Sequence, residues 1–543
     1  MKKTTVKTVA SVTLITALGF TGYLAANGAP PVAAAPNAAA VQKLDAQTHY
    51  SDEDLKWDSS DEEAIDLANP AAADGVNVNN GTITITADGT YRLSGEYNGQ
   101  VKIEAGKSDT VRLVLDNAKI TNSTGAAINV AGAGEAIIYT ASGTANTIAD
   151  GANYAAKGAD DPDAAIYSTA NLTLAGEGSL SVKGSYKAGV HTTDGLVIAN
   201  GTLDVNATKA GIKGKDYVDI VGGTVKVTAG QDGIKSTNTD DESLGFTRLS
   251  AGSVTISAGD DGLKAPRTLE ISGGTLNIEK SNEGIEAQYI NILDGDVTVN
   301  STDDGINASL KDSSSDTSSD TTSGTATTGQ QTQQNQNGQV QQAPAGGGAA
   351  PGGSQGSTGQ NQNMPQPPAD GAMPGGGGGT FEVVDAAINI SGGTVTVNAE
   401  GDGIDSNGTA TFSGGTVTVN GPVAGGNNAL DSNGDLLLNG GTVTAGSTAD
   451  MFEAPSSAST SGYLKITDSS ALTQGSTVQV TDSSGTVVAN YKITKSGVQL
   501  VLVSNKNIVK GQSYTVSVTS GSVDAASTTA ASGASELGSF TAA

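Results

Sequence analysis

Residues 210–231 read AGIKGKDYVDIVGGTVKVTAGQ, and this phrase decides the fold because close variants of it recur along the chain in one phase. The phrases begin at Ala188, Ala210, Asp232, Asp261 and Glu283, which lie 22, 22, 29 and 22 residues apart. A repeat of this length is typical of a solenoid, in which each repeat buries its apolar face only against its neighbours.

Each repeat contains three short runs in which apolar and polar residues alternate, separated by Gly, Asn or Asp. Alternation places one side of each strand inward. The pattern therefore predicts an all-β protein, a parallel β-helix with about 22 residues and three strands per coil. Val395, Val397 and Ile404 should face inward. An antiparallel sandwich is the alternative, but it needs hairpin turns between successive strands and does not explain the constant phase.

The low-complexity stretch 309–380 is rich in Ser, Thr, Gln, Gly and Pro and cannot bury a core. Its position in the repeat indicates that it is a loop within one coil. Asp261 and Asp402 each precede the glycine of the following phrase by 12 residues, whereas Asp304 precedes Gly392 by 88. We expect one solenoid that extrudes this insertion.

The chain ends differ from the repeats. Lysines followed by an apolar stretch and alanine-rich cleavage sites predict a secretory signal and leader over 1–40, with an uncleaved anchor as the alternative. The β-helix domain should occupy 41–462. Alternating strands over 463–543 predict a C-terminal β cap that protects the last coil. We expect a secreted monomer, either released or held at the cell surface, with no membrane contact after cleavage.

Composition excludes several classes of function. The formal charge of −28 over 543 residues argues against nucleic acid, because phosphate binding needs clustered basic residues. The absence of cysteine excludes disulfides and thiolate metal sites. With only 4% aromatic residues, the core must consist of Val, Ile, Leu and Ala. An acidic chain of this kind is suited to cations.

Stacking the repeats places carboxylates in columns, about 4.7–4.9 Å apart. Like charges at that distance repel by roughly 1 kcal/mol even in water, so such a column favours a bound cation. Hard oxygen ligands favour Ca²⁺. The predicted metal ligands are Asp232, Asp260, Asp261, Glu283, Asp303, Asp304, Asp402, Asp405 and Asp431.

Two simpler explanations remain open. Asp-Gly also makes a good turn, in which Asp bonds its own backbone. A second column begins with Lys213, Lys235 and Lys264, which we predict as carbohydrate-binding residues that pair with sugar carboxylates. These lysines could instead be solvated groups that protect the edge of the solenoid.

The opening LKWDSSDEEAIDL, the repeats AGIKGKDYVDIVGGTVKVTAGQDGIKS and the closing ADMFEAPSSAS resemble the secreted bacterial family of carbohydrate-binding domain-containing proteins, known from cellulolytic clostridia. The resemblance covers about 55–521 apart from the insertion. It implies a right-handed parallel β-helix similar to pectate lyases, bound calcium, and binding to acidic or cellulosic plant cell-wall polysaccharide. It carries over no calcium ligand to a numbered residue.

Three functions follow as hypotheses. The first is a non-catalytic, calcium-dependent carbohydrate-binding protein, which we favour. The second is a calcium-dependent polysaccharide lyase of the pectate type, which needs a base near the sugar carbon; Arg248, Arg267, Lys235 and Lys264 are the candidates. The third is a structural adhesin or matrix rod without a specific ligand.

Overall fold

The computed structural model describes residues 44–155, 158, 161–310, 382–468, 472–520, 523 and 527–543. The predicted leader 1–40 and all of the predicted insertion beyond Leu310 lie outside this range. No helix in the described ranges is long and apolar enough to cross a membrane. Helical structure there is limited to two 3-10 turns, η1 (Asp52–Leu55) and η2 (Ser59–Asp61).

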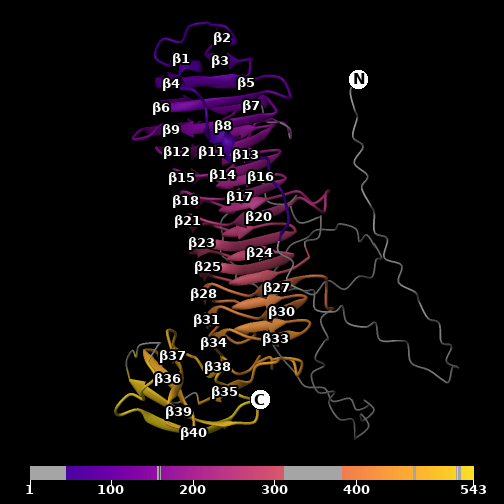
Figure 1. The fold of residues 1–543 in the computed structure, drawn as a ribbon, viewed down its shortest axis with the longest axis vertical. Coiled ribbons are helices and arrows are strands. Elements are labelled where there is room, and N and C mark those ends of the chain that lie inside the picture. The colour runs from indigo at the N-terminus through magenta and orange to yellow at the C-terminus, as the bar shows by residue number, and fades with distance from the viewer. Residues whose placement is uncertain are drawn as a thin grey trace, which may run out of the picture. The chain divides into compact units, whose positions relative to one another are not determined.

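The predicted parallel β-helix is confirmed: three strands per coil stack into three faces (Figure 1). Face one is a 13-stranded sheet. Its strands are β2 (Val76–Asn79), β3 (Thr82–Ile85), β5 (Gln100–Glu104), β7 (Ile128–Gly132), β10 (Ala164–Ser168), β13 (Ala188–Thr192), β16 (Ile212–Gly214), β19 (Ile234–Ser236), β22 (Leu263–Lys264), β24 (Ile285–Ala287), β26 (Ile306–Ala308), β29 (Ile404–Ser406) and β32 (Leu430–Ser432).

Faces two and three share a second sheet, because four long strands bend across both. These are β4 (Gly89–Asn98), β6 (Thr110–Asn122), β23 (Thr268–Ser281) and β25 (Tyr289–Ser301). Face two adds β1 (Glu62–Asp66), β8 (Glu135–Thr140), β11 (Asn171–Gly176), β14 (Gly195–Ile198), β17 (Tyr217–Ile220), β20 (Phe246–Leu249), β27 (Ala387–Ile390), β30 (Thr409–Phe412) and β33 (Leu436–Leu438). Face three adds β9 (Ala145–Asp150), β12 (Ser179–Gly184), β15 (Thr202–Ala207), β18 (Thr224–Ala229), β21 (Ser253–Ser257), β28 (Thr394–Asn398), β31 (Thr416–Asn420) and β34 (Thr442–Ser447).

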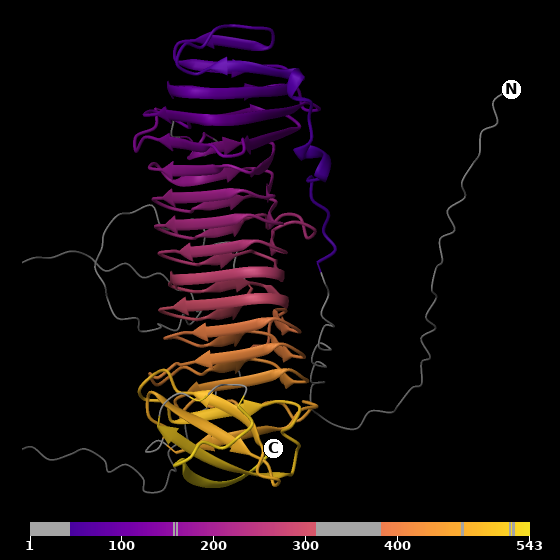
Figure 2. The ribbon, with the colours of Figure 1, turned by 60° about the vertical axis from the view of Figure 1, so that its left-hand side comes forward.

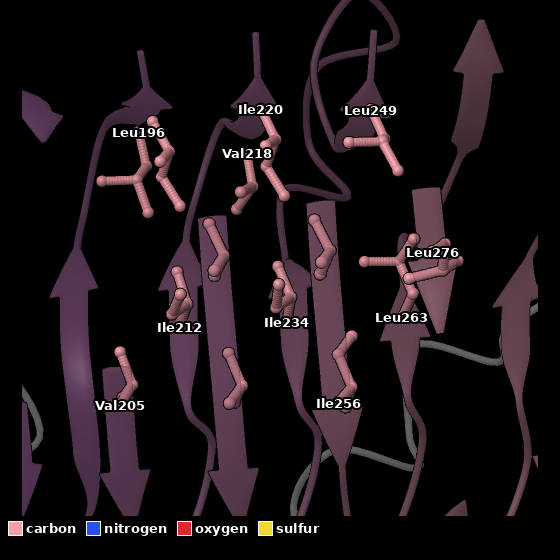
Figure 3. Close-up of a cluster of buried hydrophobic side chains, with 14 of the residues drawn as sticks. Leu196, Val205, Ile212, Val218, Ile220, Ile234, Leu249, Ile256, Leu263 and Leu276 are labelled. Atoms are coloured by element: carbon pink, nitrogen blue, oxygen red, sulfur yellow. The ribbon is translucent and has the colours of Figure 1, made fainter. Parts of the chain in front are cut away.

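The core is a column of aliphatic side chains contributed by all three faces. Ile212, Val218 and Val225 belong to one coil, and each is at most 1% exposed. Figure 3 shows side chains of successive coils converging in this way. The predicted inward residues Val395, Val397 and Ile404 are buried to the same degree. Aliphatic side chains of one coil therefore stack on those of the next, so each coil buries the apolar surface of its neighbour.

The ladders continue across the predicted insertion. β26, before it, pairs in parallel with β29, and β25 pairs in parallel with both β27 and β28. The chain thus rejoins face two one coil further on. The register agrees with the phase of the repeats on both sides.

The C-terminal segment closes the last coil. β38 (Leu500–Ser504) pairs antiparallel with β34 and with β35 (Tyr463–Thr467). A four-stranded antiparallel sheet completes the cap, formed by β36 (Ser476–Thr481), β37 (Val487–Lys492), β39 (Ser513–Ser520) and β40 (Ser535–Thr541). The change from parallel to antiparallel pairing ends the stack and covers an open sheet edge.

Residues 44–61, here called the strap, lie along face two, as the indigo segment in Figure 2 shows. Alternation predicts that only one side of each strand is buried, but β14 and β17 are buried on both sides. The reason is the strap, which packs Leu44, Ala46 and Tyr50 against a cluster of outward residues on face two. That cluster consists of Val197, Tyr217 and Phe246.

Candidate functional site

The candidate site lies where the turns from face three to face one stack on one another, called here the edge. The turn column contains the residue that lies two positions before each face-one strand, and it accepts a backbone hydrogen bond from a glycine of the preceding coil, which fixes the order. Its members are Ala210, Asp232, Asp261, Glu283, Asp304, Asp402 and Asn428. The outer column lies three residues further on in each coil, and its members pair in register: Lys213, Lys235, Lys264, Glu286, Asn307, Asp405 and Asp431.

The glycines after the turn column are needed for space. At Gly403, a Cβ would lie 2.3 Å from Cγ1 of Val419 and 2.5 Å from the carbonyl oxygen of Ala429, and its φ is not positive. The carboxylate of Asp402 accepts a hydrogen bond from the backbone N–H of Asn428 on the next coil. The Asp-Gly phrase therefore brings adjacent coils together, and the Asp402 carboxylate bonds across coils.

In the N-terminal half of the two columns, lysines form ion pairs with carboxylates. Lys235 Nζ lies 2.7 Å from Asp232 Oδ2. Lys264 Nζ lies 2.5 Å from Asp261 Oδ2 and 2.9 Å from Glu286 Oε2. Both lysine side chains are only 17% exposed. Binding of a sugar carboxylate by these lysines would therefore compete with ion pairs inside the protein.

Among the described residues, Asp261, Glu283 and Glu286 form the one group in which three ligand atoms all lie within 4.8 Å of one another. Burial raises the pKa of Asp261 to about 8, against the opposing effect of Lys264. Because the Lys264 ammonium already lies between two of these carboxylates, the group is poorly suited to a second cation. Glu286, absent from the predicted metal ligands, could have been found by counting three residues from Glu283.

In the C-terminal half of the two columns, the charged residues are acidic. Burial is the main cause that raises the pKa of Asp304 to about 7, of Asp402 to about 6 and of Asp405 to about 8. Charges of neighbouring carboxylates add to each shift, and burial also raises the pKa of Asp431. No lysine or arginine in the described part of the chain forms an ion pair with these four aspartates. A cation bound at these four carboxylates would therefore meet no competing lysine or arginine among the described residues.

The cross-coil bonds keep the acidic half in order. The backbone N–H of Asp402 donates to Asp304 Oδ1 at 2.7 Å, so one oxygen of each carboxylate in this part of the turn column is engaged. Glu453 extends the group. It accepts a hydrogen bond from the Ser432 N–H at 2.7 Å, and burial raises its pKa to about 8. It lies outside the repeats, so periodicity carries no signal for it.

The remaining predicted ligands lie further out. Asp260 and Asp303 each precede a turn-column residue and are exposed. The structure thus brings together Asp304, Asp402, Asp405 and Asp431, and pairs Asp232 and Asp261 with lysines. Asn307 and Asn428, which the sequence analysis did not assign as ligands, continue the columns.

Two arginines were proposed as lyase bases, and Arg267 donates a hydrogen bond to the Thr239 carbonyl oxygen at 3.3 Å. Arg248 donates two hydrogen bonds to the fully buried Asp219, at 2.9 and 2.6 Å, and these bonds raise the pKa of Arg248. A third bond reaches the Ala46 carbonyl oxygen in the strap. An arginine held protonated under the strap is a poor general base.

Residues 79–341 match the model of the family described as carbohydrate-binding domain-containing protein. The resemblance to carbohydrate-binding domain-containing proteins noted in the sequence is confirmed over this range, whereas secretion and bound calcium stay predictions. A carbohydrate-binding domain-containing protein of Acetivibrio thermocellus is 34% identical over 145 residues, which are 26% of this chain and 51% of the relative. The match thus spans about half of that relative's length. A solved structure of a polysaccharide lyase-like protein from C. thermocellum, a gadolinium derivative, is 31% identical, covers 44% of this chain and 99% of its own, and has a TM-score of 0.38.

Proposed function

We propose that this protein binds carbohydrate without cleaving it, and that its ligand is an acidic polysaccharide of the plant cell-wall type held along the edge with calcium. The family match supports carbohydrate binding. The observation that carries the acidic-ligand proposal is the C-terminal half of the edge, where Asp304, Asp402, Asp405 and Asp431 have no basic partner among the described residues.

The donor set there is chemically suited to calcium. Ca²⁺ takes six to eight oxygen ligands in flexible geometry. In the acidic half, no three described carboxylates bring their oxygens within 4.8 Å of one another, so the protein would supply only part of a shell. Uronate carboxylates and water would supply the rest, and the metal would neutralise both partners. Asp304, Asp402, Asp405 and Asp431 are the residues that would hold it.

The protein would act outside the cell, in keeping with the leader predicted over 1–40. Three of the four candidate bases are less suited to the lyase alternative, because Arg248 is committed to Asp219, and Lys235 and Lys264 are in ion pairs. Arg267 is the candidate that this argument leaves. The adhesin alternative differs by requiring no specific sugar.

The test is calorimetry and co-sedimentation with polygalacturonate, with calcium or with chelator. Asp304→Asn/Asp402→Asn keeps an oxygen acceptor for each cross-coil bond and removes both charges. Asp204→Asn, at an exposed position of face three, is the matched control. We expect calcium at 100 times its Kd to stabilise the wild type by about 2.7 kcal/mol, and so to raise its melting temperature. The double variant should lose most of this stabilisation and most of the polymer binding.

Each other outcome has a distinct meaning. Release of unsaturated uronate, seen by ultraviolet absorbance, would establish the lyase. Absence of calcium binding and of polymer binding in the wild type would leave the adhesin reading. If Asp204→Asn lost as much calcium stabilisation and polymer binding as the double variant, the acidic half of the edge would not be the binding site.

A further inference from the structure

A second part of the same edge has the opposite character. At the first coils, the turns Asn80–Thr82, Asn98–Gln100 and 121–125, together with the end of β9, surround a groove of about 720 Å³. This volume is within the range of roughly 300–1,000 Å³ typical of small-molecule sites. Figure 1 places these strands, β2 to β9, at the end of the stack opposite the C-terminal cap.

The lining of this groove consists mostly of amides, hydroxyls and glycine. The residues are Asn80, Gly81, Thr82, Asn98, Gly99, Gln100, Thr121, Asn122, Ser123, Thr124, Gly125, Ala149, Asp150 and Gly151. Asp150 is the one ionisable residue among them. Its carboxylate accepts from the Tyr154 hydroxyl at 2.7 Å and from the Ser185 N–H, so both oxygens are engaged. In a chain of net charge −28, a lining with a single ionisable side chain, itself engaged by internal hydrogen bonds, is distinct from the acidic half of the edge.

Part of the amide set is fixed by internal hydrogen bonds. Gln100 Nε2 and Asn122 Nδ2 both donate to the Ala126 carbonyl oxygen, at 2.9 and 2.8 Å. Thr121 Oγ1 donates to Asn98 Oδ1 at 2.5 Å. These bonds hold the planar amides in place before any ligand arrives.

Asn122 Oδ1 accepts from Thr124, but the opposite ends of the other two amides remain available. Gln100 Oε1 and Asn98 Nδ2 have no hydrogen-bond partner among the described residues, and neither has the side chain of Asn80. The groove therefore offers fixed acceptors and donors side by side. Vicinal hydroxyl groups, which donate and accept at once, are the complementary ligand.

We propose that this groove binds an uncharged oligosaccharide and needs no divalent cation to do so. The inference rests on the carbohydrate-binding function proposed above but uses different coils. Its chemistry also differs: the one carboxylate in the lining, that of Asp150, is engaged by internal hydrogen bonds, and the lining contains no cation to attract uronate. The edge would then contact neutral sugar at its first coils and acidic sugar at Asp304 and beyond.

Calorimetry with three uncharged hexasaccharides, cellohexaose, xylohexaose and mannohexaose, tests the proposal in the presence of chelator. Asn80→Gly removes one amide at a position with φ of 49°, which glycine tolerates. Ser123→Trp fills the groove from an exposed position. Ser181→Trp, exposed on β12 outside the groove, is the control.

We expect at least one hexasaccharide to bind the wild type and Ser181→Trp equally. Asn80→Gly should weaken binding about fivefold, as expected for one lost hydrogen bond, and Ser123→Trp should abolish it. Calcium-dependent binding of polygalacturonate should be unchanged in both variants. If no hexasaccharide binds the wild type, or if Ser123→Trp binds as well as the control, the inference is wrong. The polygalacturonate result then judges the proposed function separately.

Discussion

Arg248→Met should release the strap from face two. Arg248 donates paired hydrogen bonds to Asp219, and the two charges balance one another. The side chain of Arg248 is 18% exposed and that of Asp219 is 1% exposed. Removing one partner of a buried ion pair leaves the other charge uncompensated, at a loss of about 3–5 kcal/mol. The strap also loses its bond from Arg248 to the Ala46 carbonyl oxygen.

Detachment of the strap hydrates Asp219 and so limits the loss. The first consequence is therefore local opening rather than collapse of the coils. Hydrogen exchange of the peptide 44–50 should accelerate by about two orders of magnitude, the equivalent of roughly 3 kcal/mol. Trp57, the one tryptophan, should change little, because it packs edge-on against Tyr139 at 4.6 Å and bonds Glu62.

The double variant Asp219→Leu/Arg248→Met removes both charges together. Replacing a buried pair by apolar residues is often nearly neutral, so it should restore most of the protection of 44–50. The reasoning would be refuted if Arg248→Met left hydrogen exchange of 44–50 unchanged and lowered the free energy of unfolding in urea by less than about 1 kcal/mol. Equal losses in the single and double variants would show that packing, not charge, holds the strap.

Three further outcomes can be measured. Burial lowers the pKa of His49 from 6.5 to about 4. Between these two pH values the unfolded chain therefore binds more protons at this residue than the folded chain does. The stability of the wild type relative to His49→Gln should therefore fall as pH is lowered from 6.5 towards 4; a constant difference in urea midpoint would contradict this. Gly305→Ala should lower the free energy of unfolding by about 2 kcal/mol or more, as measured by thermal unfolding, because the added Cβ would lie 2.2 Å from Val397 Cγ1. Gly143→Ala is the control for backbone strain alone, since Gly143 has a φ of 72° and open space around it. Replacing 313–378 by a short Gly/Ser loop should leave the melting temperature nearly unchanged, because loop-closure entropy varies slowly with length; separate unfolding of the two halves would show that the segment is structural.

The repeat phase alone was sufficient to predict the coils. A period near 22 residues with alternating aliphatic residues admits few other packings, so Val395, Val397 and Ile404 could be placed inward from sequence. The same phase predicted which acidic residues share a column, because parallel register copies sequence offsets directly into space. Asp405 and Asp431 are register partners for this reason.

What a column residue contacts was decided by the tertiary structure. Lys264 was predicted to face a sugar, yet its ammonium lies between Asp261 and Glu286, because the side chain folds back over its own turn. Glu453 joins the acidic half from outside the repeats, where no periodicity could reveal it.

The strap shows the same limit at larger scale. Nothing in the pattern of 44–61 indicates that it lies on coils more than 100 residues away, where it packs against Tyr217 and accepts a hydrogen bond from Arg248. The neutral groove is also a product of stacking, since Asn80, Asn98 and Asn122 come from three different turns. Sequence determines structure here wherever contacts repeat with a fixed offset. Single long-range contacts have no such offset, and the folded chain alone defines them.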